Sequence, residues 1–210
     1  MLRTALFSVL LALAACGPTR IAQAGGTEVA PPVPEGMKEA VFAGGCFWCM
    51  EKPFDTLEGV ISTTSGYIGG PEKNPTYEAV SSHATHHYEG LRVVYDPVKV
   101  DYERLLGVFW HNVDPTQSNG QFCDRGDQYR TAVFTSDPAE HALFESTKAK
   151  AAALLTAPIV TQVLPAQPFW VAEEYHQDFY NKDPAHYARY RTGCGRDARL
   201  KALWGELAGH

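Results

Sequence analysis

Two consecutive glycines, Gly44 and Gly45, separate two stretches whose apolar residues follow different periods. The stretch before them, residues 38–43, is short and apolar and predicts a β-strand. The stretch after them, residues 46–57, predicts an α-helix, and the glycines predict a tight turn between the two elements. That turn places Cys46 at the N-terminus of the helix, where unpaired backbone N–H groups and the helix dipole favour a thiolate. The sequence therefore predicts a reactive cysteine on a unit of strand, turn and helix.

Strand-like and helix-like runs continue along the rest of the chain. Runs rich in β-branched and aromatic residues predict strands at residues 60–67, 89–95, 129–134 and 160–164. Helical spacing of apolar residues predicts helices at residues 101–113, 137–155, 170–180 and 200–207. Together these elements predict a mixed α+β sandwich, followed by a C-terminal tail that is rich in coil.

Composition and charge narrow the classes of partner. The 210 residues are 45% hydrophobic and 20% charged, which is typical of a globular domain with a core. The formal net charge is −6, and the lysines and arginines are scattered singly. Because no basic stripe can neutralise phosphates and no polybasic patch can bind anionic lipid, nucleic acid is not an expected partner.

The first 15 residues resemble an export signal. Arg3 precedes an apolar run at residues 5–15, which is too short to span a bilayer but suits a signal peptide. The run ends in the sequence LAAC at residues 13–16, which resembles a bacterial lipobox, so that Cys16 would carry a lipid and begin the mature protein. Alternatively, the sequence AQA at residues 22–24 fits ordinary signal cleavage and soluble export.

The segment after the signal predicts a tether. Residues 16–36 hold four glycines and four prolines without an apolar period, so they could extend to about 70 Å. The expected organisation is a signal peptide at residues 1–15, a flexible tether at 16–36 and one catalytic domain at 37–210. The protein is then expected in the cell envelope or periplasm, with the lipid on Cys16 as its contact with a membrane.

The remaining four cysteines allow several interpretations. In an oxidising compartment, the simplest expectation is two structural disulfides. Cys46 and Cys49 also have the dithiol spacing of thioredoxin-like oxidoreductases. A zinc site is disfavoured, because Cys123 and Cys194 are isolated and no second C-x-x-C pair exists. The glycines on both sides of Cys194 would let it move, as a resolving thiol must. These alternatives remain open.

Other polar candidates are ambiguous on their own. His83, His86 and His87 lie together in a polar segment, which predicts solvent-exposed side chains and no particular ligand geometry. Glu89 lies in a predicted strand, where a solvent-facing side chain is the simpler interpretation.

A series of motifs, in order, resembles the A class of peptide methionine sulfoxide reductases, which reduce the S epimer of methionine sulfoxide to methionine. The resemblance spans most of residues 38–205 and begins with GGCFW at residues 44–48, around the nucleophile of the family. The other motifs are GYIGG at 66–70, NPTY at 74–77, Glu89 ahead of VVYDP at 93–97, DPT at 114–116, DRGDQYR at 124–130, EYHQ at 174–177 and YRTGCGR at 190–196.

The resemblance implies a fold, a site and a partner. The fold is a two-layer α/β sandwich with a ferredoxin-like core, and a monomer is expected. The reductant is a thioredoxin-like protein, and neither a metal nor an organic cofactor is implied. The implied site consists of the nucleophile Cys46, the proton donor Glu89, the resolving thiol Cys194, the apolar wall Phe47 and Trp48, and the substrate-binding residues Tyr77, Asp124 and Tyr129.

The chemistry requires these residue types. A sulfoxide oxygen leaves poorly until it is protonated, so a thiolate that attacks the sulfur needs a neutral acid nearby. Burial among aromatic rings would keep the Glu89 carboxyl protonated. The reaction converts Cys46 to a sulfenic acid, which condenses with a second thiol to a disulfide. An outside dithiol must then reduce that disulfide.

Some positions depart from the family pattern. His86 and Tyr88 are bulkier than the residues usual before the acid, and Cys49 and the Phe122-Cys123 pair stand where many relatives have glycine. Either of these two cysteines could compete with Cys194. A single cysteine follows the core, so a relay through two tail cysteines cannot operate. The motifs of the class that reduces the R epimer are absent, which predicts activity on one epimer.

Overall fold

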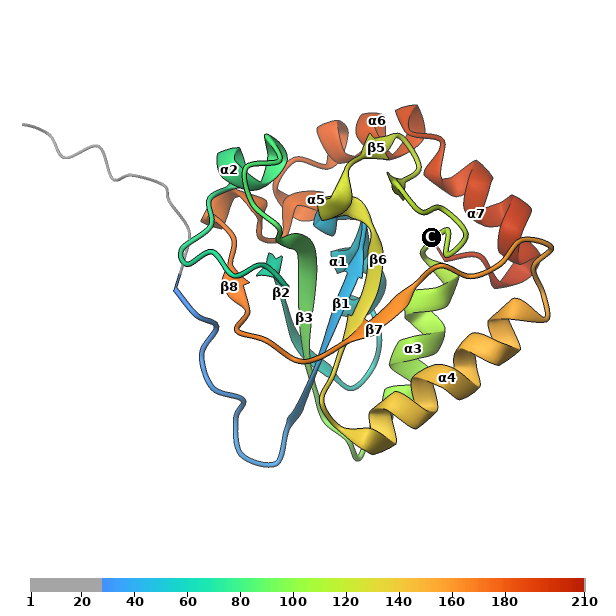
Figure 1. The fold of residues 1–210 in the computed structure, drawn as a ribbon, viewed down its shortest axis with the longest axis horizontal. Coiled ribbons are helices and arrows are strands. Elements are labelled where there is room, and N and C mark those ends of the chain that lie inside the picture. Colours follow the sequence, from blue (N-terminus) through green and yellow to red (C-terminus); the bar gives the residue numbers. More distant parts are fainter. Residues whose placement is uncertain (1–27, 210) are drawn as a thin grey trace, which may run out of the picture.

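The computed structural model describes residues 28–209 (Figure 1). The predicted signal peptide, Cys16 and most of the predicted tether lie outside the described residues. Within them, no helix is long and apolar enough to cross a membrane. The described chain forms an α+β fold around a six-stranded mixed sheet.

The elements follow the order shown in Figure 1. The strands are β1 (Lys38–Gly44), β2 (Val60–Ile68), β3 (Tyr88–Tyr95), β4 (Gly120–Gln121), β5 (Asp124–Arg125), β6 (Thr131–Phe134), β7 (Gln162–Leu164) and β8 (Trp170–Val171). The helices are α1 (Phe47–Asp55), α2 (Tyr77–Ser81), α3 (Tyr102–His111), α4 (Pro138–Ala152), α5 (Phe179–Lys182), α6 (Pro184–Gly193) and α7 (Arg196–Trp204), with 3₁₀ turns at Asp127–Tyr129, Glu174–His176 and Gly205–Leu207.

The strand order of the main sheet is β7-β6-β1-β3-β2-β8. Neighbouring strands are antiparallel, except for the parallel pair of β6 and β7. In chain order, the four central strands alternate with two helices as β1, α1, β2, β3, α3 and β6, with α2 between β2 and β3 and with β4 and β5 between α3 and β6. Strands β4 and β5 form a separate two-stranded sheet.

The main core lies between the sheet and the helices. Alternate residues of a strand face opposite sides, and on β1 this directs Phe42 toward α1 and α3. Its ring stacks on Phe54 of α1 and Phe109 of α3, with centroids 5.1 and 5.4 Å apart. Replacing a buried phenylalanine of this kind by alanine costs about 3–5 kcal/mol. The packing therefore fixes α1, and with it Cys46, relative to the end of β1.

The other face of the sheet is covered by loops, including part of the predicted tether. Val41 and Ala43 face this side and pack with Phe169. Residues 28–33 run along this face: the Ala30 N–H donates to the Phe169 carbonyl at 2.9 Å, and Arg92 donates to the Pro31 carbonyl at 2.9 Å. The predicted tether at residues 16–36 therefore needs correction, because its last part belongs to the domain.

The C-terminal tail also differs from the expectation. Residues 170–180, predicted as one helix, form β8, a 3₁₀ turn and α5, because the Gln177 side chain bonds both backbone groups of Ser65 and Asp178 adopts φ +51°. The part of the tail predicted as coil contains α6, and the helix predicted at residues 200–207 begins earlier, as α7. The Asp183 side chain caps the His186 N–H at 3.0 Å, with Pro184 in the first turn, so α6 begins with strong helix signals.

Candidate active site

The two glycines hold Cys46 against the end of the sheet. Gly45 has φ +85°, and a Cβ atom there would lie 2.5 Å from Cβ of Gln121. A Cβ atom on Gly44 would contact Sδ of Met50, so a larger residue there would require the Met50 side chain to move. The positive φ of Gly45 favours glycine and turns the chain directly from β1 into α1. Cys46 is the N-cap residue of α1, as the sequence predicted.

Cys46 and Cys49 form a buried dithiol. Their side chains are 6% and 1% exposed, and both thiols are free of disulfides. The Cys49 N–H donates to the Cys46 carbonyl at 3.1 Å, which closes the first turn of α1. A hydrogen bond from Cys46 lowers the pKa of Cys49 to about 6, whereas burial raises the pKa of Cys46. Near neutral pH, the pair therefore holds one proton and one negative charge. The two sulfur atoms share both, so neither is assigned to one cysteine alone.

Arg196 supplies positive charge to this dithiol. Its side chain is 1% exposed and donates to the Asn112 carbonyl at 2.7 Å, to the Gly44 carbonyl at 3.2 Å and to Sδ of Met50 at 3.2 Å. Among the described residues, Arg196 forms no ion pair with a carboxylate. The charge of Arg196 lowers the pKa of Cys49 further. The guanidinium therefore favours the anionic forms of both Cys49 and Asp124.

Glu89 lies directly beside the dithiol. Its side chain is 2% exposed, and its Oε2 accepts the Phe47 N–H at 3.1 Å, one residue after Cys46. Burial raises the pKa of Glu89 to about 8, against a smaller opposing effect of the Phe47 hydrogen bond. The carboxyl group is therefore protonated at neutral pH and can donate a proton. The simpler interpretation of Glu89 as a solvent-facing residue is wrong.

Two tyrosines and an aspartate surround the same point. Burial raises the pKa of Tyr77 to about 12 and also raises the pKa of Tyr129, with smaller contributions from the negative charges of Glu89 and Cys46. Both phenols therefore remain hydrogen-bond donors. Asp124 accepts a hydrogen bond from the Tyr190 hydroxyl. The structure thus brings Tyr77, Tyr129 and Asp124 to the end of α1, together with Cys46 and Glu89.

The predicted apolar wall divides into two layers. Phe47 is buried, and its ring lies 6.1 Å from the ring of Tyr67. Trp48 is half-buried and stacks on Phe179 of α5, with centroids 3.7 Å apart. Its Nε1–H donates to Nδ1 of His176 at 3.0 Å, which fixes the indole. Trp48 can therefore contact a ligand, while Phe47 supports the site from below.

Comparison with known proteins supports the motif-based resemblance. The model of the peptide methionine sulfoxide reductase family matches residues 38–208. This chain belongs to the peptide methionine sulfoxide reductase family. It is 54% identical over 167 residues to peptide methionine sulfoxide reductase MsrA 2 of Caulobacter vibrioides, covering 79% of this chain and 85% of the relative. It is 49% identical over 168 residues to MsrA of Bacillus subtilis, covering 79% and 95%.

Solved structures of reductases show the same fold. Mxr1 from Saccharomyces cerevisiae in reduced form superposes with a TM-score of 0.69 at 30% identity, covering 74% of this chain and 90% of that one. Methionine sulfoxide reductase A of Corynebacterium diphtheriae gives a TM-score of 0.65 at 29% identity, covering 80% and 92%. Family membership decides against a thioredoxin-like oxidoreductase built on Cys46 and Cys49.

Cys194 has a different partner from the predicted one. In this reductase it forms a disulfide with Cys123, with Cα atoms 4.9 Å apart, whereas Cys46 and Cys49 are thiols. Cys123 is exposed and Cys194 is half-buried. The state described here therefore holds one buried dithiol and one disulfide near the surface.

Sequence reasoning gave no role to Tyr190, Glu173 and His176. The Tyr190 hydroxyl donates a hydrogen bond to Asp124, and Tyr190 also lowers the pKa of Cys46, against the larger effect of burial. Glu173 accepts from the Tyr67 hydroxyl at 2.7 Å and from the Tyr77 N–H at 2.8 Å. Burial lowers the pKa of His176 to about 4, so its neutral ring accepts from Trp48. His176 and Tyr190 fall within family motifs, which was the one available signal for them.

The three clustered histidines differ in burial. His83 and His86 are exposed, as predicted. His87 is buried, which contradicts the prediction: its Nδ1 accepts the Gly70 N–H at 3.2 Å, and its Nε2 contacts the Glu72 carbonyl at 2.8 Å. It therefore supports the loop after β2.

Two groups of potential metal ligands do not form convincing sites. Cys123, Asp124 and Cys194 lie close together, but the disulfide removes two thiolates. The second group comprises Glu51, Asp55 and Asp178. Burial raises the pKa of Glu51 to about 7, and Thr63 and Tyr180 occupy the two oxygens of Asp55.

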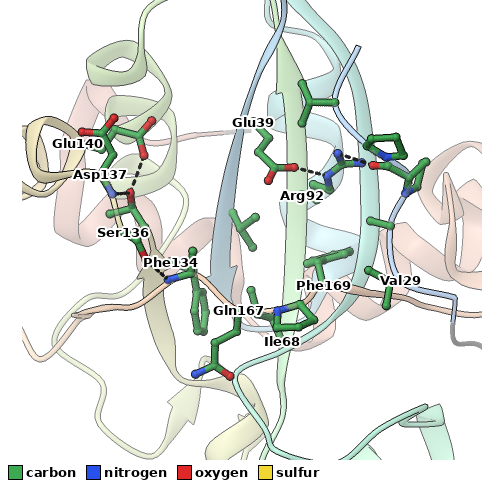
Figure 2. Close-up of a pocket in the computed structure, with 18 residues that line it drawn as sticks. Val29, Glu39, Ile68, Arg92, Phe134, Ser136, Asp137, Glu140, Gln167 and Phe169 are labelled. Carbon is green, nitrogen blue, oxygen red and sulfur yellow. Dashed lines mark hydrogen bonds and ion pairs between the residues drawn. The ribbon is translucent and has the colours of Figure 1, made fainter. Parts of the chain in front are cut away.

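A cavity of about 380 Å³ lies on the face of the sheet that loops cover (Figure 2). Phe134 and Phe169 line it from two sides, and Val29 lies beside Phe169 (Figure 2). Glu39 and Arg92 form an ion pair of 2.6 Å at its wall. None of the eight predicted site residues lines this cavity, so it is separate from the dithiol.

Proposed function

We propose that this chain reduces methionine S-sulfoxide to methionine, with Cys46 as the nucleophile and Glu89 as the acid. The observation that carries the proposal is the protonated Glu89 carboxyl, held by the Phe47 N–H beside a buried thiol and thiolate pair. A nucleophile and a neutral acid at one point are what reduction of a sulfoxide requires.

The proposed reaction begins with the dithiol. Cys49 takes the proton of Cys46 through their shared hydrogen bond, and Cys46 attacks the sulfoxide sulfur as a thiolate. Glu89 protonates the sulfoxide oxygen, which passes to Cys46 as the S–O bond of the substrate breaks. The products are methionine and the Cys46 sulfenic acid, so the substrate is reduced by two electrons and Cys46 is oxidised by two.

The remaining site residues would bind the substrate. The phenols of Tyr77 and Tyr129 donate to the sulfoxide oxygen, where negative charge develops in the transition state. Trp48 contacts the methyl group, with Phe47 behind it, and Asp124 binds the polar end of the substrate. Support comes from the protonated state of both phenols, the half-buried indole and the position of all five residues around Cys46.

The test uses both epimers separately. With dithiothreitol as reductant, the S epimer in a short peptide should be consumed and the R epimer should persist. Cys46→Ser should consume neither. Equal consumption of both epimers would refute the epimer specificity, and undiminished activity of Cys46→Ser would refute the proposed nucleophile.

We also propose that a thioredoxin-like protein regenerates the enzyme. Each turnover oxidises the protein by two electrons. An external dithiol is the natural source of the two electrons that restore the reduced enzyme. Mxr1 from Saccharomyces cerevisiae has been solved in complex with Trx2, and it shares this fold with a TM-score of 0.51 at 20% identity. Thioredoxin with its reductase and NADPH should sustain turnover, and NADPH oxidation that does not depend on S-sulfoxide would contradict this.

Finally, we propose that the protein is exported and anchored by a lipid on Cys16. The support is the apolar run at residues 5–15, which ends at the sequence LAAC. An alkyne fatty acid fed to expressing cells should label the wild type and Cys123→Ser, but not Cys16→Ser. A mature N-terminus at residue 25 would instead establish soluble export.

A further inference from the structure

We propose that the four cysteines form a relay of two disulfides: Cys49 resolves the sulfenic acid on Cys46, and the Cys123–Cys194 pair then carries the oxidation to the surface. This inference rests on the proposed function of Cys46. It departs from the sequence-based expectation, in which Cys194 resolves the sulfenic acid directly.

The position of Cys49 makes it the first partner of Cys46. The two cysteines lie in the first turn of α1, where the Cys49 N–H donates to the Cys46 carbonyl at 3.1 Å, and both are buried, free thiols. Condensation between them therefore involves a single helical turn. Cys194, in contrast, is bonded to Cys123. The charge of Arg196 also favours the thiolate of Cys49, and the thiolate is the form that attacks.

The residues next to the surface disulfide contact the residues next to the dithiol. Arg196, two positions after Cys194, donates to the Gly44 carbonyl at 3.2 Å and lies 4.4 Å above the ring of Phe122. Phe122 precedes Cys123 in the chain. A single guanidinium therefore joins the segments that carry both disulfide cysteines to the turn that precedes Cys46.

Tyr190 makes a second connection. Its hydroxyl is hydrogen-bonded to Asp124, the residue after Cys123, and its ring lies edge-on to Trp48 with centroids 5.8 Å apart. Tyr190 lies one helical turn before Cys194 on α6. Figure 1 shows α6 beside β5, the strand that begins at Asp124. The two cysteine pairs therefore share one small region at the end of the sheet.

The segment around Cys194 can move between the two pairs. Cys194 is the C-cap residue of α6, and Gly195, at φ +65°, separates α6 from α7. A Cβ atom on Gly193 or Gly195 would meet no other atom within 4 Å, so both glycines lie in open space. In the proposed relay, these two uncrowded glycines are the hinge about which Cys194 approaches the dithiol.

Each step of the relay is balanced. The Cys46 sulfenic acid and the Cys49 thiol form a disulfide and release water. The Cys194 thiolate attacks the sulfur of Cys49, which forms a Cys49–Cys194 bond and releases the Cys46 thiolate. Cys123 then attacks the sulfur of Cys194, which forms the Cys123–Cys194 disulfide and releases the Cys49 thiolate. Two electrons have moved from the surface pair to the buried pair.

The experiment follows the oxidation state of each cysteine after one turnover. Full-length protein carrying Cys16→Ser is reduced with dithiothreitol, freed of reductant and given one equivalent of an S-sulfoxide peptide. After acid quenching and alkylation, peptide mapping should find the Cys123–Cys194 disulfide, with Cys46 and Cys49 as thiols. A second equivalent should add the Cys46–Cys49 disulfide.

Two variants distinguish the relay from direct resolution by Cys194. In Cys49→Ser, dimedone should trap a sulfenic acid on Cys46, and Cys123 and Cys194 should remain thiols. In Cys123→Ser, the Cys49–Cys194 bond should accumulate. A disulfide that contains Cys194 in the Cys49→Ser variant would overturn the relay, as would a Cys123–Cys194 bond that stays oxidised throughout as a structural bridge.

A steady-state comparison tests access by the reductant. The double variant Cys123→Ser with Cys194→Ser should lose at least about tenfold of its thioredoxin-driven turnover, because the Cys46–Cys49 disulfide is buried. With saturating dithiothreitol it should lose less than about threefold. Equal losses with the two reductants would contradict the relay. If the wild type does not consume the S epimer with dithiothreitol, the proposed function itself fails, which is a separate result.

Discussion

The two cysteine pairs have the same chemistry in opposite surroundings. Cys46 and Cys49 lie beneath aromatic rings beside a protonated carboxyl group, whereas Cys123 is exposed and Cys194 half-buried. A site that excludes water favours a neutral Glu89 and strengthens its hydrogen bond to a sulfoxide. The same exclusion keeps out a protein reductant. The difference indicates that reduction of the substrate and exchange with a partner require separate sites.

The largest expected effect is the loss of the buried nucleophile. Cys46→Ser should lower the consumption of S-sulfoxide by at least about 10³-fold, because a serine hydroxyl is a far weaker nucleophile than a thiolate. Chromatography of the substrate peptide measures this. Residual activity above about 1% of the wild type would mean that another cysteine can attack the substrate.

The second effect concerns the acid beside the buried pair. Glu89→Gln retains an acceptor for the Phe47 N–H but removes the proton, so the single-turnover rate should fall by about 10²–10⁴-fold. Rapid quench with an S-sulfoxide peptide measures the rate. The matched control is the Cys123→Ser and Cys194→Ser double variant, whose first turnover should keep the wild-type rate. A comparable fall in that control would show that the two pairs do not have separate tasks.

The pH dependence of the first turnover should report on the buried pair alone. Glu89 must be protonated, and its pKa is raised to about 8, so the rate should be lost as the pH rises through about 8. The dithiol must carry its negative charge, and the pKa of Cys49 is lowered to about 6, so the rate should also be lost as the pH falls through about 6. Stopped-flow or quench measurements should therefore give a bell-shaped profile. In Glu89→Gln, the alkaline limb should disappear.

The smallest effect is expected from the charge that balances the thiolate. Arg196→Lys keeps a positive charge but places it differently, and Arg196→Met removes it. Removal should raise the pKa of Cys49 and move the acid limb upward by about one unit, which thiolate absorbance near 240 nm can follow. Arg199→Met is the control, because Arg199 is half-exposed and pairs with Asp114 at 2.7 Å. An equal shift in the control would assign the effect to general charge.

Local patterns predicted the part of the site that is local in the chain. The glycine pair predicted the turn, and the turn predicted Cys46 at the start of α1, because both depend on neighbouring residues only. The burial of Glu89 depends on its register opposite Tyr67 and on α1 above it, which no pattern within β3 contains. The motif resemblance, not the strand pattern, indicated Glu89 as the candidate acid.

The tail shows where patterns fail. Helix α6 has few apolar residues, so periodicity gave no signal, although Asp183 and Pro184 form a good helix start. The pairing of Cys194 with Cys123 joins residues 71 positions apart, and spacing cannot determine such a pairing. The proximity of Cys46 and Cys49 follows from one turn of helix, whereas the family motifs indicate Cys194 as the resolving thiol.

The buried guanidinium of Arg196 links the oxidation state of the dithiol to the attachment of the C-terminal tail. While Cys49 is a thiolate, Arg196 has an anion nearby and α7 is held against the Gly44 carbonyl. A Cys46–Cys49 disulfide is neutral, so it removes one of the two anions near the guanidinium and leaves the Asp124 carboxylate. In the proposed relay, this loss of charge would weaken one attachment of the segment that carries Cys194. The tail would then be easier to displace in the oxidised state, which is the state that needs its thiol.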